Sequence, residues 1–209
     1  MTTVIDHLLW AAPDLDQGSA LFHDLTGVEA AVGGVHDGFG TRNRLAALND
    51  GIYFEIIAPD PAQPLAGTLG ERIAAMPHTQ LMQFALRSND LDGVLAAARS
   101  VGLTVQEPLD MSRTRPDGVR LEWSILYLDD PRWPGFLPFV IDWKGSPHPS
   151  ASAPGGCSLR DFVILHPDPQ SLAEVYAALG VSIRTDRATR PSLQAVLDTP
   201  RGPLVLTGA

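Results

Sequence analysis

The sequence has few of the residues that cross-link, anchor or export a protein. Cys157 is the single cysteine among 209 residues, so no intrachain disulfide can form. No apolar run approaches the roughly 20 residues that a membrane-spanning helix needs. No basic residue precedes Arg42, so the N-terminus lacks the charged start of a signal peptide. We therefore expect a cytoplasmic protein with no membrane partner.

Positive charge is also scarce. The chain has 15 lysine and arginine residues against 24 aspartate and glutamate residues, and its net charge is −9 at pH 7. Nucleic acids and anionic membranes are bound through basic patches, so neither is an expected partner. Hydrophobic residues make up 44% of the chain, which at this length is enough for a substantial core. The composition therefore predicts an ordered globular protein.

The sequence contains three copies of one pattern, a short apolar segment typical of a strand that is followed by an aspartate. The three copies cover residues 5–16, 81–92 and 161–169. Asp14 and Asp90 lie 76 positions apart near the ends of the first two copies, and the same offset places Gln83 on His7. The third copy, at an offset of 154, places Asp161 on that position. A polar residue at one matched strand position suggests a site built between repeats.

Each strand is followed by a pattern typical of a helix. Aspartate is a favoured N-cap, and glycine is a favoured left-handed stop. Cap and glycine are 13, 12 and 12 residues apart in the three copies, at Asp14–Gly27, Asp90–Gly102 and Asp168–Gly180. The similar lengths predict a βα unit repeated along the chain.

Turn-rich strands, not further helices, follow each predicted helix. Asp37-Gly38 and Asp117-Gly118 precede the first such strand of the first two copies. The predicted strands cover residues 41–48, 52–57, 119–128, 137–143, 192–198 and 203–207. The pattern predicts an α+β fold with two βαβββ modules and a third, shorter βαββ-like module. The predicted boundaries are 1–62, 79–144 and 158–209.

Residues 145–157 separate the second and third modules. The stretch is rich in Pro, Ser and Gly, which predicts an extended, poorly packed linker. In the third module, Leu206 stands where the first module has a glutamate. We interpret this module as a structural annex or a dimerisation element, because its strand edges need a partner in the chain or in a second subunit.

Two βαβββ modules with a polar residue on the first strand and a glutamate on the last resemble the vicinal oxygen chelate superfamily. This superfamily includes glyoxalase I, extradiol dioxygenases and bleomycin-resistance proteins. Residues 33–43 (GGVHDGFGTRN) and 53–60 (YFEIIAPD) are similar to its glyoxalase-like domain branch. The resemblance covers about residues 3–148 and implies tandem modules that form a cleft. It does not specify a reaction, because one fold hosts many chemistries.

The resemblance also implies a metal site, because the superfamily takes ligands from the first and last strands of each module. His7 and Gln83 match the first-strand positions, and Glu55 matches the last-strand position of module one. Such a mixed set of nitrogen and oxygen ligands would hold a divalent ion such as zinc, nickel, manganese or iron. With Gln83 in place of a second histidine, the two-histidine chemistry of extradiol dioxygenases is not expected.

The fourth ligand is less clear from the sequence. Asp142 is the acidic candidate on the last strand of module two, and Glu122 on another strand is the alternative. If residues 138–139 are equivalent to residues 53–54, then Val140 takes the position of Glu55. Asp142 lies two residues further on, on the same strand face but displaced by one pleat.

Three residues are candidates for substrate binding, each with a plainer alternative. His36 lies in a glycine-rich stretch where backbone can approach a ligand, or the glycines only shape a hairpin and a bulge. Asn43 and Arg42 alternate on the strand of residues 41–48, so only one of them can line the cleft; Asn43 is on the same face as Thr41 and Leu45. Trp123 aligns with Asn43, and it is either a ligand platform or a core residue.

Two function classes follow. In the first, a metal-dependent lyase or isomerase acts on a small carbonyl or oxygen-chelating substrate, with Glu55 as ligand or base. In the second, a protein without chemistry binds an aromatic or hydrophobic molecule in the same cleft. His7 would then be an ordinary hydrogen-bonded histidine.

Overall fold

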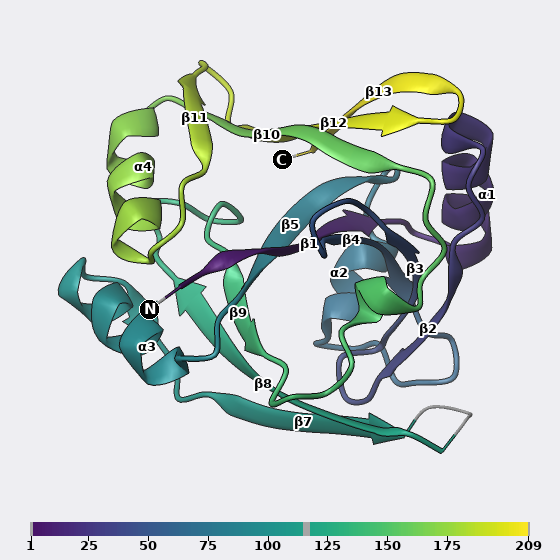
Figure 1. Ribbon diagram of the computed structural model, residues 1–209, viewed down its shortest axis with the longest axis horizontal. Coiled ribbons are helices and arrows are strands. Elements are labelled where there is room, and N and C mark those ends of the chain that lie inside the picture. Colours follow the sequence, from purple (N-terminus) through teal and green to yellow (C-terminus); the bar gives the residue numbers. More distant parts are fainter. Residues whose placement is uncertain (1, 115–117, 209) are drawn as a thin grey trace.

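A computed structural model describes residues 2–114 and 118–208; Asp117, in one predicted turn, lies outside them. The described chain has an α+β fold with a nine-stranded mixed sheet and a four-stranded sheet (Figure 1). Within these ranges no helix is both long and apolar enough to cross a bilayer.

The first two modules both run strand, helix, strands, as predicted. The elements of the first are β1 (Val4–Ala11), α1 (Leu15–Thr26), β2 (Ala31–His36), β3 (Thr41–Ala47) and β4 (Tyr53–Pro59). Those of the second are β5 (Gln80–Arg87), α3 (Leu91–Ser100), β6 (Thr104–Val105), β7 (Leu109–Thr114), β8 (Arg120–Asp129) and β9 (Phe139–Asp142). The short helix α2 (Leu69–Ala74), which the sequence analysis did not predict, joins the two modules.

The third module has one strand more than predicted. Its elements are β10 (Ser158–His166), α4 (Pro169–Ala178), β11 (Arg184–Arg187), β12 (Ser192–Thr199) and β13 (Gly202–Gly208). The additional strand, β11, pairs parallel with β10, and the sheet order is β11-β10-β12-β13. This order differs from the first module, where β1 pairs parallel with the last strand, β4.

The predicted helix caps are confirmed in all three modules. The side chains of Asp14, Asp90 and Asp168 each accept a hydrogen bond from the backbone N–H three residues later. Such a bond satisfies one of the donors left free at a helix N-terminus. At the other end of α1, Gly27 takes the predicted left-handed conformation, with φ of 78°.

The repeat is visible in the sheet itself. Strands β1 and β5 have bounds 76 residues apart and lie side by side, antiparallel, at the centre of the order β2-β3-β4-β1-β5-β9-β8. His7 pairs with Ala85 and Leu9 with Gln83, around the central pair Leu8 and Phe84. A local two-fold through that central pair exchanges the two modules and places Gln83 on His7.

A β-bulge is repeated with the strands. The register shifts at Asp6 in β1, at Met82 in β5 and at Arg160 in β10, and these residues are left unpaired. They are separated by the offsets 76 and 154 that relate the three copies. A bulge breaks the alternation of side chains along a strand. Ile5, two residues before His7, therefore packs against the larger core and not on the face that carries His7.

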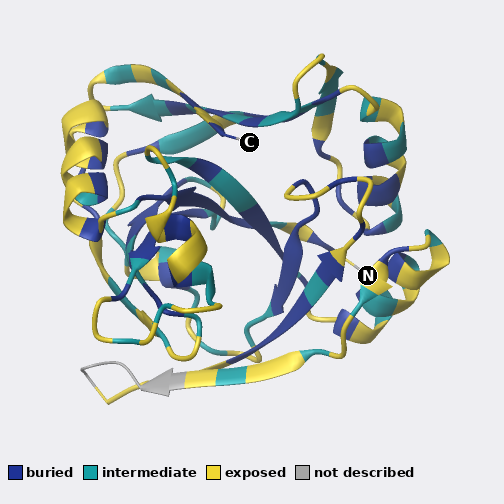
Figure 2. Ribbon diagram, turned by 180° about the vertical axis from the view of Figure 1, so that it is seen from behind, coloured by how far each residue is buried: buried dark blue, intermediate teal, exposed yellow. Residues whose placement is uncertain are grey.

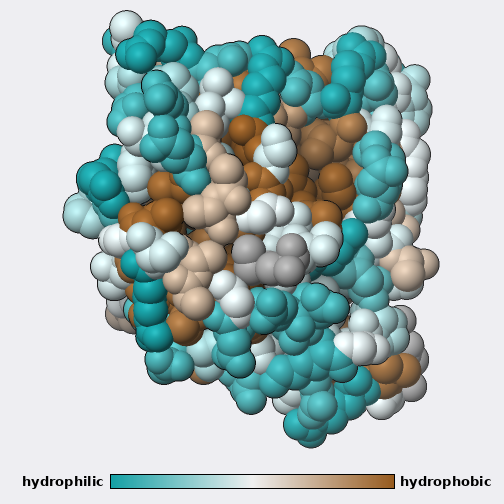
Figure 3. All heavy atoms as spheres, turned by 60° about the vertical axis from the view of Figure 1, so that its left-hand side comes forward, coloured by the Kyte–Doolittle hydropathy of each residue, from teal (hydrophilic) through white to brown (hydrophobic). Residues whose placement is uncertain are grey.

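The third module is part of one continuous core. The rings of Phe162 on β10 and Tyr176 on α4 pack against Phe84 of β5, with centroids 5.1 Å and 6.0 Å away. The Tyr176 hydroxyl also donates a 2.6 Å hydrogen bond to the carbonyl of Phe136. Figure 2 shows the buried residues on the central strands and the inner faces of the helices. On the side that carries α3 and α4, hydrophilic side chains surround a hydrophobic hollow (Figure 3).

The composition predicts a poorly packed linker between the second and third modules, but this stretch is anchored by specific contacts even though half of its residues are exposed. It contains one 3-10 turn, η1 (Pro149–Ala151), and Pro149 is buried. The amide of Ala47 donates to the carbonyl of Pro154 at 2.7 Å. The hydroxyl of Ser146 bonds the backbone of Glu122 at both its amide and its carbonyl. We call residues 145–156 the strap.

Candidate functional site

A cavity of about 120 Å³ lies on the face of the large sheet opposite the third module, between the first two modules. Its walls are mostly apolar. The polar side chains that line it come from β1 to β5: His7, His36, Thr41, Asn43, Glu55 and Gln83. Three predicted metal ligands, His7, Glu55 and Gln83, therefore face one cavity, and so do the three predicted substrate-binding residues.

A buried hydrogen-bonded chain runs from Asp6 through His7 to Glu55. Oδ2 of Asp6 lies 2.7 Å from Nδ1 of His7, and Nε2 of His7 lies 3.2 Å from Oε2 of Glu55. The three residues are 0%, 2% and 4% exposed. The His7 ring is stacked on Tyr53, with centroids 4.3 Å apart, which fixes its plane.

Burial and hydrogen bonding shift the pKa values of these three residues in opposite directions, and the effect of hydrogen bonding is the larger. Burial lowers the pKa of His7, but the bonds to Asp6 and Glu55 outweigh it and raise that pKa to about 9. Burial raises the pKa of Glu55, but His7 outweighs it and lowers that pKa to about 2. The pKa of Asp6 is lowered too, because His148 and His7 more than offset its burial. At pH 7 an imidazolium therefore lies between two carboxylates.

The second oxygen of Glu55 is held by module one. Asn43 Nδ2 donates to Oε1 of Glu55 at 2.6 Å, and Nε2 of His36 lies 3.7 Å from the same oxygen. The amide of Gly34 donates to Oδ1 of Asn43 at 2.7 Å. A side chain at Gly33 would collide with Asn43, because a Cβ there would lie 2.1 Å from Oδ1. The glycines thus leave room for the residue that orients Glu55.

His36 lies at the end of β2 and not in a loop. The register of β2 with β3 shifts at Gly33, so the predicted alternative of a hairpin with a bulge is the arrangement found. His36 nevertheless lines the cavity, and its Nδ1 lies 2.9 Å from the hydroxyl of Thr41. The structure thus shows the hairpin and the bulge, and ligand binding by His36 stays a prediction.

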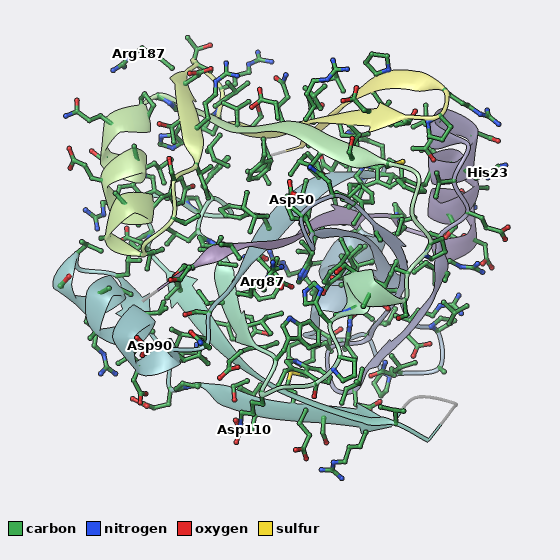
Figure 4. All side chains as sticks on the ribbon, viewed as in Figure 1. His23, Asp50, Arg87, Asp90, Asp110 and Arg187 are labelled. Atoms are coloured by element: carbon green, nitrogen blue, oxygen red, sulfur yellow. The ribbon has the colours of Figure 1, made fainter. Side chains whose placement is uncertain are left out.

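Asp6 is held by groups from three further segments, none of which the sequence pattern indicated. Its Oδ1 accepts from Trp143 Nε1 at 3.2 Å and lies 2.8 Å from Nε2 of His148 in the strap. Arg87 NH1 is 3.6 Å from the same oxygen and donates to the carbonyl of Gly51 at 2.6 Å. Figure 4 shows Arg87 and Asp50, the neighbour of Gly51, near the middle of the view. Asp6 thus joins β1 to β5, to Trp143 after β9 and to the strap.

The structure does not bring Asp142 to the cavity. In β1–β4 Leu9 pairs with Glu55, and in β5–β9 the equivalent residue, Ala85, pairs with Phe139. Phe139, and not the predicted Val140, therefore occupies the position of Glu55. Asp142 instead caps the following turn, where its Oδ1 accepts from the amide of Lys144 at 2.8 Å. The alternative, Glu122, is exposed and pairs with Arg120.

Trp123 is a cavity residue, but its equivalent differs from the prediction. Because Phe139 is equivalent to Glu55, the β8–β9 register makes Ile125 the equivalent of Asn43, and Trp123 that of Thr41. The ring of Trp123 lies 5.8 Å from that of Trp143, which also lines the cavity.

The donor set is compatible with a divalent ion, although it is incomplete. Among residues 2–114 and 118–208, no three His, Cys, Asp or Glu side chains are grouped as metal ligands. Two ligands of one ion, each about 2.0–2.2 Å from it, are roughly 3 Å apart. The 3.2 Å between His7 Nε2 and Glu55 Oε2 meets that requirement. Asp6 orients His7 through Nδ1, as an outer carboxylate does for a metal-bound histidine.

Gln83 would be the third ligand. Its amide nitrogen donates to the carbonyl of Leu137 at 3.2 Å, which leaves its amide oxygen as the group available to the cavity. With Phe139 in the fourth position, the remaining coordination positions would belong to water or to a bound molecule.

Comparison with known proteins agrees with the fold. The glyoxalase-like domain family matches residues 5–180. No curated protein matches the chain. A hypothetical protein from Staphylococcus aureus, 18% identical, has a TM-score of 0.67 over 99% of this chain and 85% of its own.

Two methylmalonyl-CoA epimerases share the fold over part of this chain. Methylmalonyl-CoA epimerase from Mycobacterium tuberculosis, 21% identical, has a TM-score of 0.51 over 71% of this chain and 91% of its own. A variant of the Streptomyces coelicolor epimerase in complex with 2-nitronate-propionyl-CoA, 22% identical, has a TM-score of 0.51 over 71% of this chain and 100% of its own. At these identities the likeness shows the fold alone.

Proposed function

The chain belongs to the glyoxalase-like domain family of the vicinal oxygen chelate superfamily, and we propose that it is an enzyme that moves a proton on a small carbonyl compound, with Glu55 as the base. The observation that supports this is the Glu55 carboxylate, buried at the wall of the cavity with one oxygen 3.2 Å from His7 Nε2 and the other bonded by Asn43. A buried carboxylate whose charge is held by specific partners is characteristic of functional sites.

Glu55 and His7 would have complementary roles. A carboxylate with a pKa of about 2 is a weak base while His7 donates to it. When a carbonyl oxygen of the substrate accepts the N–H of His7 instead, Glu55 loses that partner and its basicity rises. Glu55 then takes a proton from the carbon next to the carbonyl, and His7 stabilises the negative oxygen that develops. If the substrate carries a hydroxyl group on that carbon, its hydroxyl proton moves to the former carbonyl oxygen, and Glu55 returns the carbon-bound proton to the former carbonyl carbon, which completes an isomerisation.

A divalent ion fits the same residues. His7 Nε2, the Glu55 carboxylate and the Gln83 amide oxygen would hold it, and Asn43 and Asp6 would orient Glu55 and His7. When bound, such an ion supplies polarisation of the substrate oxygen. Because His7 must lose its proton to bind an ion, we expect metal uptake to weaken as the pH falls.

The second candidate is a binding protein without chemistry. It is supported by Phe139, which occupies the position equivalent to Glu55 and lines the cavity beside His7, with ring centroids 5.5 Å apart. In this case the polar chain would only anchor an oxygen of the ligand.

Substitution of Glu55 by glutamine tests the proposal, because it keeps the shape and removes the charge. The matched control is Glu122→Gln, at an exposed glutamate outside the cavity. Zinc, nickel and manganese uptake would be measured by equilibrium dialysis of protein purified without chelator. Base activity would be followed by NMR as exchange, in D₂O, of the protons on the carbon next to the carbonyl of hydroxyacetone and of its phenyl counterpart, 2-hydroxyacetophenone.

We expect the wild type and Glu122→Gln to behave alike. Glu55→Gln should lose at least 100-fold in exchange rate, and most metal uptake, with an unchanged circular dichroism spectrum. If Glu55→Gln exchanges protons as fast as the wild type, Glu55 is not the base. If the wild type catalyses no exchange, with or without these metals, the binding function is favoured.

A further inference from the structure

The two modules contribute different chemistry to equivalent walls of the cavity. The strand pairings give the equivalences residue by residue. His36 corresponds to Met111, Thr41 to Trp123, Asn43 to Ile125, Leu45 to Tyr127 and Glu55 to Phe139. All ten of these residues line the cavity.

Polar groups belong almost entirely to one half. The module-one half holds Glu55, Asn43, Thr41 and His36, joined to one another and to His7 by hydrogen bonds and close polar contacts. In the module-two half, each equivalent of these four residues is apolar or aromatic. The polar groups on this side are Gln83, which is the equivalent of His7, and the hydroxyl of Tyr127.

Aromatic rings make up much of the module-two half. The rings of Trp123 and Trp143 are 5.8 Å apart, and those of Tyr127 and Phe139 are 6.0 Å apart. Phe139 also lies 5.5 Å from the ring of His7, so the aromatic half begins where the polar half ends. Rings at such separations accept a further ring in edge-to-face or offset contact.

We propose that the substrate is a small aryl compound with an oxygen-bearing substituent, whose ring lies against the module-two half and whose oxygen faces His7 and Glu55. This assignment of substrate class and orientation rests on the proposed function of the same cavity. The cavity volume of about 120 Å³ is close to the roughly 150 Å³ of an engineered cavity that takes up benzene. One substituted ring, not a fused system, is therefore the expected size.

The four tryptophans provide a direct test. Trp123 and Trp143 line the cavity, whereas Trp10 and Trp133 lie in the other core cluster. In protein labelled with ¹⁵N, the indole N–H signals report binding at four known places, and single Trp→Phe variants assign them. The probes are acetophenone, cyclohexyl methyl ketone and acetone, which share one carbonyl and differ in the group attached to it.

We expect acetophenone to shift the signals of Trp123 and Trp143 in a saturable manner and to leave those of Trp10 and Trp133 in place. It should bind at least five-fold more tightly than cyclohexyl methyl ketone, and acetone should not saturate. Trp123→Leu should weaken acetophenone binding at least five-fold, and Trp123→Phe should restore most of it. A circular dichroism spectrum and a melting temperature of each variant establish that it is folded.

Three results would overturn the inference. The first is equal affinity for acetophenone and cyclohexyl methyl ketone. The second is a shift of the Trp10 or Trp133 signal as large as those of Trp123 and Trp143. The third is that no indole N–H signal shifts up to the solubility limit of acetophenone. Glu55→Gln separates this inference from the proposed function, because the ring-binding half is intact in that variant. If acetophenone binds to Glu55→Gln but the wild type catalyses no proton exchange, the substrate class stands and the base function fails.

Discussion

Asp6 and His7 are consecutive residues of one strand, yet their side chains hydrogen-bond to each other at 2.7 Å in the protein interior. Successive side chains of a regular strand point to opposite faces and cannot meet in this way. The bulge at Asp6 removes that restriction, because the register of β1 with β5 shifts there. The same bulge at Met82 and Arg160 shows that the contact uses a feature present in all three copies.

The first prediction concerns the pH dependence of stability of the metal-free protein. Because the pKa of His7 is raised to about 9, its contribution is complete below its unfolded pKa of 6.5 and is lost as the pH rises through 9. Because the pKa of Glu55 is lowered to about 2, its contribution is complete above 4.5 and is lost as the pH falls towards 2. Urea unfolding should therefore show highest stability between about pH 4.5 and 6.5.

The fall in the free energy of unfolding between pH 6.5 and 9 should reach at most about 3 kcal/mol, from the size of the His7 shift. Asp6→Asn should lower the pKa of His7, measured by NMR titration, and flatten this fall. Equal slopes in Asp6→Asn and the wild type would contradict the assignment to His7.

The second prediction separates the two ligand candidates of module two. Gln83→Leu should reduce zinc uptake about ten-fold, because it removes the amide oxygen that this half offers as a ligand. Asp142→Asn should leave uptake unchanged, since Asp142 lies at the Lys144 turn and its asparagine oxygen can still accept that amide. Loss of uptake in Asp142→Asn alone would restore Asp142 as the fourth ligand.

The third prediction concerns the strap. His148→Ala should destabilise the protein by about 1.5–3 kcal/mol, the usual range for a hydrogen bond to a charged group, because Asp6 loses one partner. Limited proteolysis should then cut within residues 145–156 of the variant much faster than in the wild type. His78→Ala, at an exposed histidine, is the control. Rapid cleavage of the wild-type strap would mean that its packing is weak.

The fourth prediction concerns the third module. Tyr176→Phe should lower the free energy of unfolding by about 1–3 kcal/mol, because it leaves the buried carbonyl of Phe136 without its donor. Unfolding should remain one transition, since the Phe84 contacts join this module to the central sheet. Val205→Thr, on an exposed part of β13, should have little effect. Two separate transitions in the wild type would show an independent third module.

The sequence alone determined the repeated architecture, because its signals are local. The caps at Asp14, Asp90 and Asp168 and the left-handed glycines each depend on residues a few positions away. The 76-residue offset then placed Gln83 on His7 without any knowledge of the sheet. Glu55 could be identified for the same reason, since a charged residue among apolar neighbours is evident in the strand itself.

Only the tertiary structure decided which residues contact Asp6 and which residue occupies the fourth ligand position. Trp143 and His148 reach Asp6 across 137 and 142 residues, a distance over which no local pattern acts. The composition of the strap predicted an unpacked linker, but buried contacts hold it in place. The position opposite Ala85 was fixed by the register of β9, and a one-residue difference in register exchanges the two faces of a strand. That single residue makes Phe139, and not Val140, the equivalent of Glu55, and it leaves Asp142 off the face that lines the cavity.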